Sequence, residues 1–456
     1  MNILLLTTYH PRAQHVGARR WAALSDELAS RNHSILHITT NRLLSDSSLS
    51  TDLNPLPSAN KYQYLTASYS YFFSLKLGLL AFLRNVLAAR RSSSPAGANF
   101  CFDQHPSIRY SLFRAINKLL KQVFYLIFLN RIPEEKSWAN KAFNKHKSSV
   151  AIFNPDLIIA SYPLWGPALL AEKFGNHLKI PFILDVRDPI SRDPQLPIAF
   201  MNSYEKIEGV ILSKATAILC INASVAKLLV PRNKLQQKLY ILPNPIKINS
   251  ASSEFCSLAH TEYTNSRLSR DSVLRLGYLG TIHTQSLLPE YLATLARVYS
   301  NHEKKLCIQY YGRDFQKLKC FFPESLDCSL NNFGYIDLEK EYFSIVNNVD
   351  IFIIAGFPGV RGKCVMTGKI FDYIRFGKPI VALCQNGDEL SRLLLEYRIG
   401  IPFFSVDEIL HAFLNVDNLI SSLSNSYKPD LNRLKSLCVD QLALELDKLI
   451  ISFASL

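Results

Sequence analysis

Several features that would assign a protein to a class at once are absent from this sequence of 456 residues. Its nine cysteines are odd in number and form no CxxC pair, so a zinc site or a disulfide framework is not expected, and a reducing compartment is. No run of about 18 uncharged apolar residues occurs, which argues against a membrane-spanning helix. The N-terminus lacks a basic region and a small-residue cleavage site, so we expect no signal peptide.

Acidic side chains are scarce in one part of the chain. The sequence has 51 Lys and Arg against 37 Asp and Glu, a formal net charge of +14. Fourteen basic and three acidic residues lie between Lys61 and Lys147, and they account for +11 of this total. Such an excess favours an anionic partner. No zinc-finger, helix-turn-helix or RNP-like pattern accompanies the charge, so we expect no nucleic-acid partner.

The sequence does contain enough apolar surface for two or three folded domains, since 48% of its residues are hydrophobic. Short apolar runs alternate with helical stretches, as in βαβ units with parallel sheets. The predicted strands are Asn2–Thr8, Ile35–Thr40, Leu157–Ser161, Phe182–Val186, Ala217–Ile221, Leu239–Leu242, Arg275–Leu279, Leu306–Tyr311, Asp350–Ala355 and Pro379–Cys384. Predicted helices include one with Trp21, Leu24 and Leu28 on its apolar side, then Pro167–Phe174, Leu287–Val298, Lys369–Phe376, Glu389–Tyr397 and Leu434–Ile451.

A linker divides these elements into two groups. Pro243-Asn244-Pro245 and the Ser-rich stretch that follows it are typical of a connection between domains. We therefore expect an α/β protein with two Rossmann-like domains, whose parallel sheets face a central cleft. The predicted limits are 1–242 for the first domain with a helical, basic insertion at 41–150, 256–433 for the second domain, and 434–456 for a C-terminal helix.

The insertion contains a candidate membrane-binding helix at Arg109–Arg131. Its apolar residues fall on one side, and basic residues that include Arg114, Lys118 and Lys121 fall mainly on the other. Such a helix can lie on an anionic membrane surface, where each basic residue contributes about 1 kcal/mol. The alternative is an ordinary domain helix with a solvated basic face.

The segment Asp350–Leu383 carries the most informative chemistry: a strand, a loop rich in glycine and cations, a helix and a second strand. Backbone N–H groups at a helix start, with cations beside them, attract phosphate. Asp372 lies one turn into the helix, where its carboxylate could accept hydrogen bonds from both hydroxyls of a ribose. The alternative is a βα loop whose cations face solvent.

Several blocks of this sequence, in order, resemble family-4-like glycosyltransferases with the GT-B fold. Thr367-Gly368-Lys369-Ile370-Phe371-Asp372-Tyr373 with Gly377-Lys378-Pro379-Ile380 resembles the family's "pGKlfEYla-GkPIl" block. The other matching blocks are Asn154–Ile158, Ile180–Pro189 ("giPfi-D-RDpw"), Ile241–Pro245 ("viPNg"), Leu276–Thr281 ("igYiGt") and Gly17 with Arg19 and Arg20. The resemblance covers most of the chain except residues 41–130.

The resemblance implies a retaining, metal-independent transfer of a hexose from a nucleotide sugar, most commonly a UDP-sugar, with no cofactor. Together with the basic insertion, it leads us to expect a bacterial enzyme that is peripheral on the cytoplasmic face of the membrane, with a glycan, lipid-linked or surface-polysaccharide acceptor. Because there is no DxD motif for Mg²⁺, the new charge on the nucleoside diphosphate would be stabilised by cations and backbone N–H groups. The donor-binding residues would be Gly17, Thr281, Arg361, Lys363, Thr367, Gly368, Lys369 and Asp372.

Within this assignment, Lys369 and Arg361 would contact the diphosphate, and Asp372 the ribose. Arg187 and Asp188, at the end of a first-domain strand, would face the sugar or the acceptor, and Asp188 would orient the acceptor hydroxyl. With Lys369 they are the candidate catalytic residues. The alternative for Arg187 and Asp188 is a helix cap or a structural ion pair.

The sequence also departs from the family pattern. Many relatives have a glutamate where this chain has Cys364, and an Arg and a Lys where it has Thr281, His283 and Gln285. A thiol cannot replace the charge-assisted contact of a carboxylate to a sugar hydroxyl. Two other functions therefore stay open: a nucleotide-sugar epimerase or hydrolase of the same fold, and a degenerate, non-catalytic GT-B scaffold.

Overall fold

The computed structural model of the chain describes residues 1–10, 16–40, 62–67, 132–162, 164–192, 198–230, 238–258, 273–299, 305–322, 329–338 and 340–454. The chain forms two compact units. The first unit is Met1–Ala18, His33–Asp185 and Gln195–Ala217, and the second is Arg19–Asn32, Val186–Pro194 and Ile218–Leu456. The predicted domain limits differ from these bounds, because three stretches of the predicted first domain group with the second unit: Arg19–Asn32, Val186–Pro194 and the residues from Ile218 to the linker. The predicted limits stay a prediction.

The first sheet has seven strands in the order β3-β2-β1-β4-β5-β6-β7, and each pair with a described register is parallel. The strands are β1 (Asn2–Leu6), β2 (Ser34–Thr40), β3 (Tyr62–Ala67), β4 (Leu157–Tyr162), β5 (Phe182–Val186), β6 (Ala217–Cys220) and β7 (Leu239–Ile241). All the strands predicted before the linker are confirmed, with ends that differ by at most two residues. Continuous apolar runs made them recognisable, because central parallel strands are covered on both faces.

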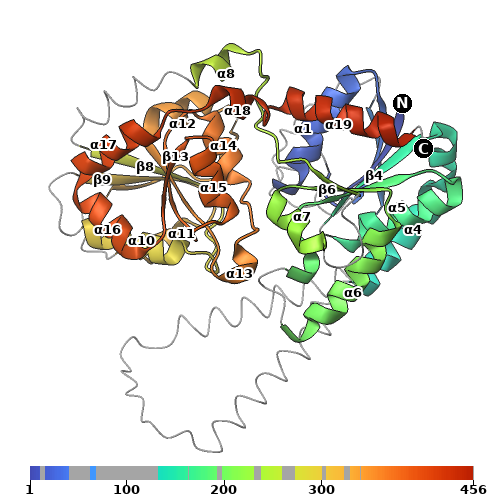
Figure 1. The fold of residues 1–456 in the computed structure, drawn as a ribbon, viewed down its shortest axis with the longest axis horizontal. Helices are drawn as coiled ribbons and strands as arrows, with labels where there is room; N and C mark the ends of the chain where they lie inside the picture. Colours follow the sequence, from blue (N-terminus) through green and yellow to red (C-terminus); the bar gives the residue numbers. More distant parts are fainter. Residues whose placement is uncertain are drawn as a thin grey trace, which may run out of the picture. The chain divides into compact units, whose positions relative to one another are not determined.

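The helices that accompany this sheet are α1 (Val16–Ser30), α4 (Ile132–Phe153), α5 (Trp165–Leu178), α6 (Ile198–Lys214) and α7 (Ala223–Leu229). Helix α4 packs against α5, and α5 against β4 (Figure 1). Trp138 of α4 is fully buried, and its indole N–H donates to the carbonyl of Ala67 at 2.9 Å. The ring of Trp165 meets Tyr162 edge-on at 5.7 Å.

The range 41–150, which was expected to be a helical insertion, contains a strand of the first sheet as well as most of helix α4. Residues Tyr62–Ala67 form β3, which pairs in parallel with β2 at the edge of the sheet, and α4 packs on β3. The segment YQYLTA mixes polar and apolar residues, and an edge strand needs no continuous apolar run. The βαβ pattern therefore continues into this range. The candidate membrane helix with Arg114, Lys118 and Lys121 lies outside the described residues.

The second sheet has six strands in the order β10-β9-β8-β11-β12-β13, again in parallel pairs. The strands are β8 (Val273–Leu279), β9 (Lys305–Tyr311), β10 (Ser329–Asn332), β11 (Ile351–Ala355), β12 (Ile380–Leu383) and β13 (Gly400–Phe403). The four central strands confirm the prediction. The edge strands β10 and β13 were not predicted, because each is short and interrupted by polar residues or proline.

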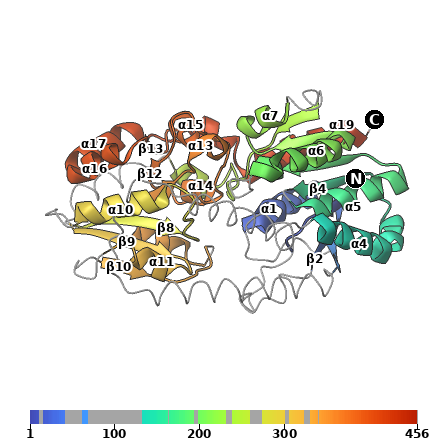
Figure 2. The ribbon, with the colours of Figure 1, turned by 90° about the horizontal axis from the view of Figure 1, so that it is seen from below.

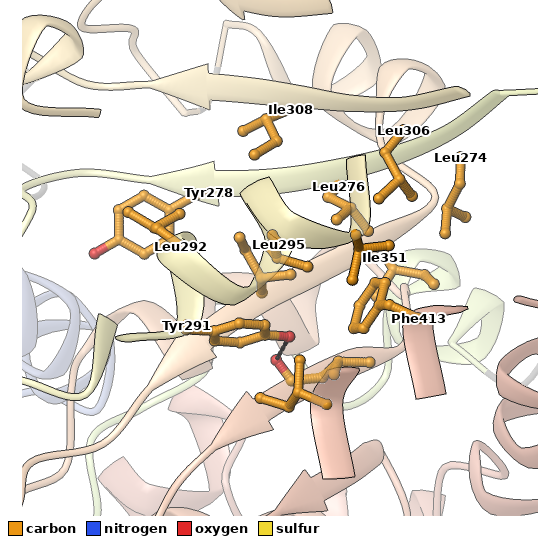
Figure 3. Close-up of a cluster of buried hydrophobic side chains, with 14 of the residues drawn as sticks. Leu274, Leu276, Tyr278, Tyr291, Leu292, Leu295, Leu306, Ile308, Ile351 and Phe413 are labelled. Carbon is orange, nitrogen blue, oxygen red and sulfur yellow. Dashed lines mark hydrogen bonds between the residues drawn. The ribbon is translucent and has the colours of Figure 1, made fainter. Parts of the chain in front are cut away.

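Helices cover both faces of this sheet. They are α8 (Ser253–Ser257), α10 (Leu288–Tyr299), α11 (Phe315–Lys319), α12 (Tyr342–Asn348), α13 (Gly359–Gly362), α14 (Lys369–Arg375), α15 (Glu389–Glu396), α16 (Val406–Leu414) and α17 (Val416–Ser426). One apolar core lies under α10, α16 and α17. Figure 3 shows this core, where the buried Tyr291 hydroxyl donates to the Val381 carbonyl at 3.3 Å. The second core lies under α12, α14 and α15, and Figure 2 shows α16 and α17 side by side near β13.

The single helix expected at Leu434–Ile451 is two helices, α18 (Leu431–Lys435) and α19 (Val439–Ala454). Between them the chain pairs with Ile246 as an isolated parallel bridge. The N–H of Ile246 donates to Leu437 at 2.8 Å, and the N–H of Val439 donates to Ile246 at 3.2 Å. This pairing uses backbone groups that a continuous helix would need, so the apolar pattern alone could not reveal the break.

Candidate functional site

Strand β8 and helix α14 together position the candidate site in the second sheet. The apolar residues of α14 pack in the core, where the rings of Tyr373 and Phe352 stack with centroids 4.2 Å apart. The Tyr373 hydroxyl accepts a hydrogen bond from the N–H of Leu279, the last residue of β8, at 3.0 Å. These contacts fix the start of α14 beside the carboxyl end of β8, which is where parallel sheets bind ligands.

Lys369, the first residue of α14, is half-buried at this point. Its ammonium donates to the Tyr278 hydroxyl at 2.5 Å and to the Thr281 carbonyl at 2.8 Å. The same nitrogen lies 4.3 Å from the centre of the Tyr278 ring, within the range of a cation–π contact. In the described part of the chain, its hydrogen-bond partners are thus neutral oxygens rather than a carboxylate.

The loop that follows β8 contacts Lys369 and is hydrogen-bonded to Tyr310 and Asp314. Gly280 has φ +85°, and a Cβ on it would lie 3.2 Å from Cε of Lys369, so the loop passes close to the lysine. The Tyr310 hydroxyl donates to the Gly280 carbonyl at 3.0 Å. Asp314 accepts from the N–H of Ile282 at 3.0 Å, and its own N–H donates to the Tyr310 hydroxyl at 2.8 Å.

Burial and charge set the protonation of these groups. Burial lowers the pKa of Lys369 to about 7, and the Asp314 carboxylate opposes this change. Burial works against ionisation of Asp314 as well, but hydrogen bonds from Lys317 and from the Ile282 N–H outweigh it and lower the pKa of Asp314. Burial, followed by the nearby charge of Lys369, lowers the pKa of His283. The site therefore holds a lysine that changes charge near neutral pH.

Asp372, the predicted ribose ligand, accepts from the guanidinium of Arg19 at 2.9 Å. Both residues belong to the second unit, and their side chains are 29% and 43% exposed. Asp372 lies three residues after Lys369, one turn along α14, as the sequence spacing predicts. The pairing of Asp372 with a cation from α1 was not predicted from the sequence.

The predicted phosphate loop lies just before α14. Gly368 is the N-terminal cap of the helix, and Thr367 beside it is half-buried. Lys363 is exposed, and the side chain of Arg361 lies outside the described residues. Cys364 is 5% exposed, and its carbonyl accepts from the side chain of Asn222 at 3.0 Å.

The other predicted residues lie on elements of the first sheet. Arg187 and Asp188 directly follow β5, as expected, and Asp188 is exposed. Gly17 is in the first turn of α1 rather than in a loop, because the helix begins at Val16. Gly17 belongs to the first unit, whereas Arg187, Asp188, Thr281 and Lys369 belong to the second. The structure thus brings together Lys369, Thr281, Thr367, Gly368 and Asp372.

Tyr278, Tyr310 and Asp314 are part of this site and were not predicted. Tyr278 and Tyr310 are register partners on β8 and β9, which a predicted pairing of these strands could have indicated. In the described residues, no group of three or more His, Cys, Asp and Glu side chains is arranged to hold a metal ion. The described helices likewise include none with the length and low charge needed to cross a bilayer.

No protein-family model and no curated protein matches this sequence. Solved structures do match over nearly the whole chain. HepE of Anabaena, in complex with UDP-glucose, is 10% identical, with a TM-score of 0.57 over 99% of this chain and 100% of that one. The chain has the GT-B fold. A glycosyltransferase from Rickettsia africae also shares this GT-B fold, at 11% identity and a TM-score of 0.50 over 98% of this chain and 97% of that one.

Proposed function

We propose that this chain is a glycosyltransferase that moves a hexose from a nucleotide-sugar donor to a glycan or lipid-linked acceptor, with retention and without a metal. The observation that carries this proposal is the Lys369 ammonium, which is half-buried and bound only to neutral oxygens in the described chain. An anionic ligand would supply a negative charge in direct contact with the ammonium. Solved structures of HepE hold UDP-glucose and UDP, and this supports a nucleotide sugar as that ligand.

The chemistry follows from the bond that breaks. As the anomeric C–O bond of the donor cleaves, negative charge develops on the departing nucleoside diphosphate, and a new C–O bond forms to the acceptor hydroxyl, which loses its proton. Lys369, with Arg361, Lys363 and the backbone N–H groups of Thr367 and Gly368, would stabilise that charge. Asp372 would accept from the ribose hydroxyls, which requires it to exchange its contact with Arg19.

The remaining roles belong to residues on the other elements. Asp188 would orient the acceptor hydroxyl and Arg187 would contact the sugar, since both follow the carboxyl end of β5. Thr281 would contact the diphosphate from the loop that already binds Lys369. Gly17 would allow a close approach of backbone to ligand.

A thermal-shift screen against UDP, GDP, dTDP, ADP, NAD and single-stranded DNA tests the proposal. A ligand at about 100 times its dissociation constant stabilises the folded state by about 2.7 kcal/mol, which is readily measured. We expect a shift with one nucleoside diphosphate, absent in Asp372→Ala and retained in the control Asp407→Ala, an exposed aspartate of α16. No shift with any nucleotide would overturn the proposal and favour the non-catalytic scaffold, for which the buried Cys364 in place of a glutamate is the supporting observation.

We further propose that the protein binds peripherally to the anionic cytoplasmic face of a bacterial membrane through Arg114, Lys118 and Lys121. The basic excess between residues 61 and 147 supports this, and the described helix α4 continues it with the exposed Lys136, Lys141 and Lys147. Changing the three proposed residues to Gln should abolish sedimentation with phosphatidylserine vesicles at low salt. The same change at the exposed Lys428, Lys435 and Lys448 is the control, and equal loss in both would contradict the proposal.

A further inference from the structure

Asp314 contacts the loop after β8 and, through Tyr310, the strand β9, and both of these belong to the Lys369 site. It precedes α11, and one carboxylate oxygen accepts from the N–H of Ile282 at 3.0 Å. The other oxygen accepts from Lys317 at 2.8 Å. The N–H of Asp314 donates to the Tyr310 hydroxyl, which in turn donates to the carbonyl of Gly280.

These contacts anchor the residues on both sides of Thr281. Gly280 is held through Tyr310, and Ile282 is held by the carboxylate, so the Thr281 carbonyl between them has a fixed direction. That carbonyl accepts from Lys369 at 2.8 Å and from the Tyr278 hydroxyl at 2.9 Å. A residue 55 positions before Lys369 in the sequence therefore determines where the ammonium is held.

Asp314 also acts on Lys369 through its charge. Burial favours the neutral form of the lysine and lowers its pKa, and Asp314 is the group that favours the charged form. The neighbours that contribute titratable or charged side chains are Tyr278 on β8, His283 on the next loop, Tyr310 on β9, Asp314 and Lys317 at α11, and Asp372 and Tyr373 on α14. Among these, Lys317 is paired with Asp314 and reduces the field that the carboxylate exerts.

We propose that Asp314 is a positioning residue for Lys369: it fixes the loop that binds the ammonium, and its negative charge keeps that ammonium protonated for an anionic ligand. The inference rests on the proposed function, because the ligand it serves is the diphosphate of a nucleotide sugar. Binding of such a ligand near pH 7 would be accompanied by proton uptake at Lys369. Asp314 would lower the free energy required for that uptake.

The test is the affinity for UDP-glucose between pH 5.5 and 8.5, measured by calorimetry. UDP-glucose is a suitable probe because it lacks the terminal phosphate group that titrates near pH 6 in UDP. In the wild type, we expect affinity to fall by up to tenfold per pH unit above about pH 7, since one pH unit corresponds to one tenfold step in the protonated fraction.

Two substitutions should move this profile in opposite directions. Asp314→Asn keeps an oxygen that can accept from Ile282 but removes the charge, so the decline should begin about half a pH unit lower, or about threefold weaker binding at pH 8. Lys317→Gln removes the cation that neutralises Asp314, so the decline should begin at higher pH. At pH 5.5, where Lys369 is charged in all three proteins, the affinities should be equal.

The outcomes separate the two proposals. Coincident profiles, or an equal loss of affinity at every pH, would overturn the role of Asp314, because a merely structural residue would not shift the profile. If the wild-type protein bound none of the UDP-, GDP-, dTDP- and ADP-sugars at pH 6, the proposed function itself would be overturned, and this inference with it. Thermal unfolding without ligand shows that each variant is folded.

Discussion

The cations near the two ends of β8 have different partners: one is paired with a carboxylate, and the other is bound to neutral oxygens. Near its start, Arg275 is paired with Asp350, which accepts from the guanidinium at 3.2 Å and from the Arg275 N–H at 2.9 Å. Near its other end, Lys369 is held by the Tyr278 hydroxyl and the Thr281 carbonyl. A buried charge that is already paired serves the fold, whereas a cation with neutral partners retains the capacity to bind an anion.

The largest effect should follow from removing the Lys369 cation near the carboxyl end of β8. We expect Lys369→Met to lower turnover by about 10²–10³-fold, the usual loss when one preorganised donor to a developing negative charge is removed. Its free energy of unfolding should be unchanged or higher, because a partly buried charge is replaced by an apolar side chain. Initial rates and urea denaturation measure the two effects.

A matched control for this prediction is Lys448→Met, which removes an exposed lysine of α19 and should leave turnover unchanged. A Lys369→Met enzyme with wild-type turnover would refute the catalytic role of the lysine. Equal damage in both variants would show that the effect is not local to the site.

The opposite pattern is expected at the start of β8. Asp350 is 3% exposed, so Asp350→Ala leaves Arg275 and the backbone N–H of β8 without their carboxylate partner. We expect the free energy of unfolding to fall by about 2–3 kcal/mol, with no change in nucleotide-sugar affinity once the protein is folded. Urea denaturation measures the free energy of unfolding, and calorimetry on the folded protein measures the nucleotide-sugar affinity. A loss of stability no larger than that of Asp407→Ala would mean that the pair does not support the sheet.

Gly280→Ala tests how closely backbone and lysine approach each other. The residue has φ +85°, and the added methyl group would lie 3.2 Å from Cε of Lys369. We expect a loss of about 1–2 kcal/mol in stability from the backbone conformation alone, and weaker nucleotide-sugar binding because Lys369 must shift. Gly334→Ala is the control, since it has φ +70° with open space around its Cβ, and it should lose stability without losing affinity.

The smallest effect should come from the exposed ion pair. Arg19 and Asp372 are 43% and 29% exposed, so Arg19→Gln should change the free energy of unfolding by less than about 1 kcal/mol. Urea denaturation in low and high salt provides the measurement. A loss comparable to that of Asp350→Ala would show that exposure does not distinguish the two pairs.

Sequence reasoning identified the elements that have a continuous local pattern. The central strands of both sheets were predicted because they are buried on both faces, and Lys369 and Asp372 because they lie one turn apart in a recognisable block. The edge strand β3 was missed because it is short, mixes polar and apolar residues without a continuous apolar run, and lies within a basic segment.

The residues that support Lys369 could not be predicted in the same way. Asp314 and Tyr310 reach the site only through the pairing of β8 with β9 and the turn into α11, so no local spacing relates them to Lys369. The break between α18 and α19 depends on Ile246, nearly two hundred residues away in the sequence, so a helical apolar pattern extends across it unchanged. Contacts between distant segments are what the sequence pattern lacks.

The positions of the three tryptophans have an optical consequence. Trp138 and Trp165 lie in the first unit, Trp21 lies in the α1 segment that groups with the second unit, and no tryptophan follows residue 165 in the sequence. The second sheet and the helices that cover it therefore contain no indole of their own, and their aromatic rings are those of tyrosine and phenylalanine. Replacing the 40%-exposed Phe333 with tryptophan in a chain whose native indoles had been changed to phenylalanine would give that sheet its own fluorescence, and its unfolding could be recorded separately.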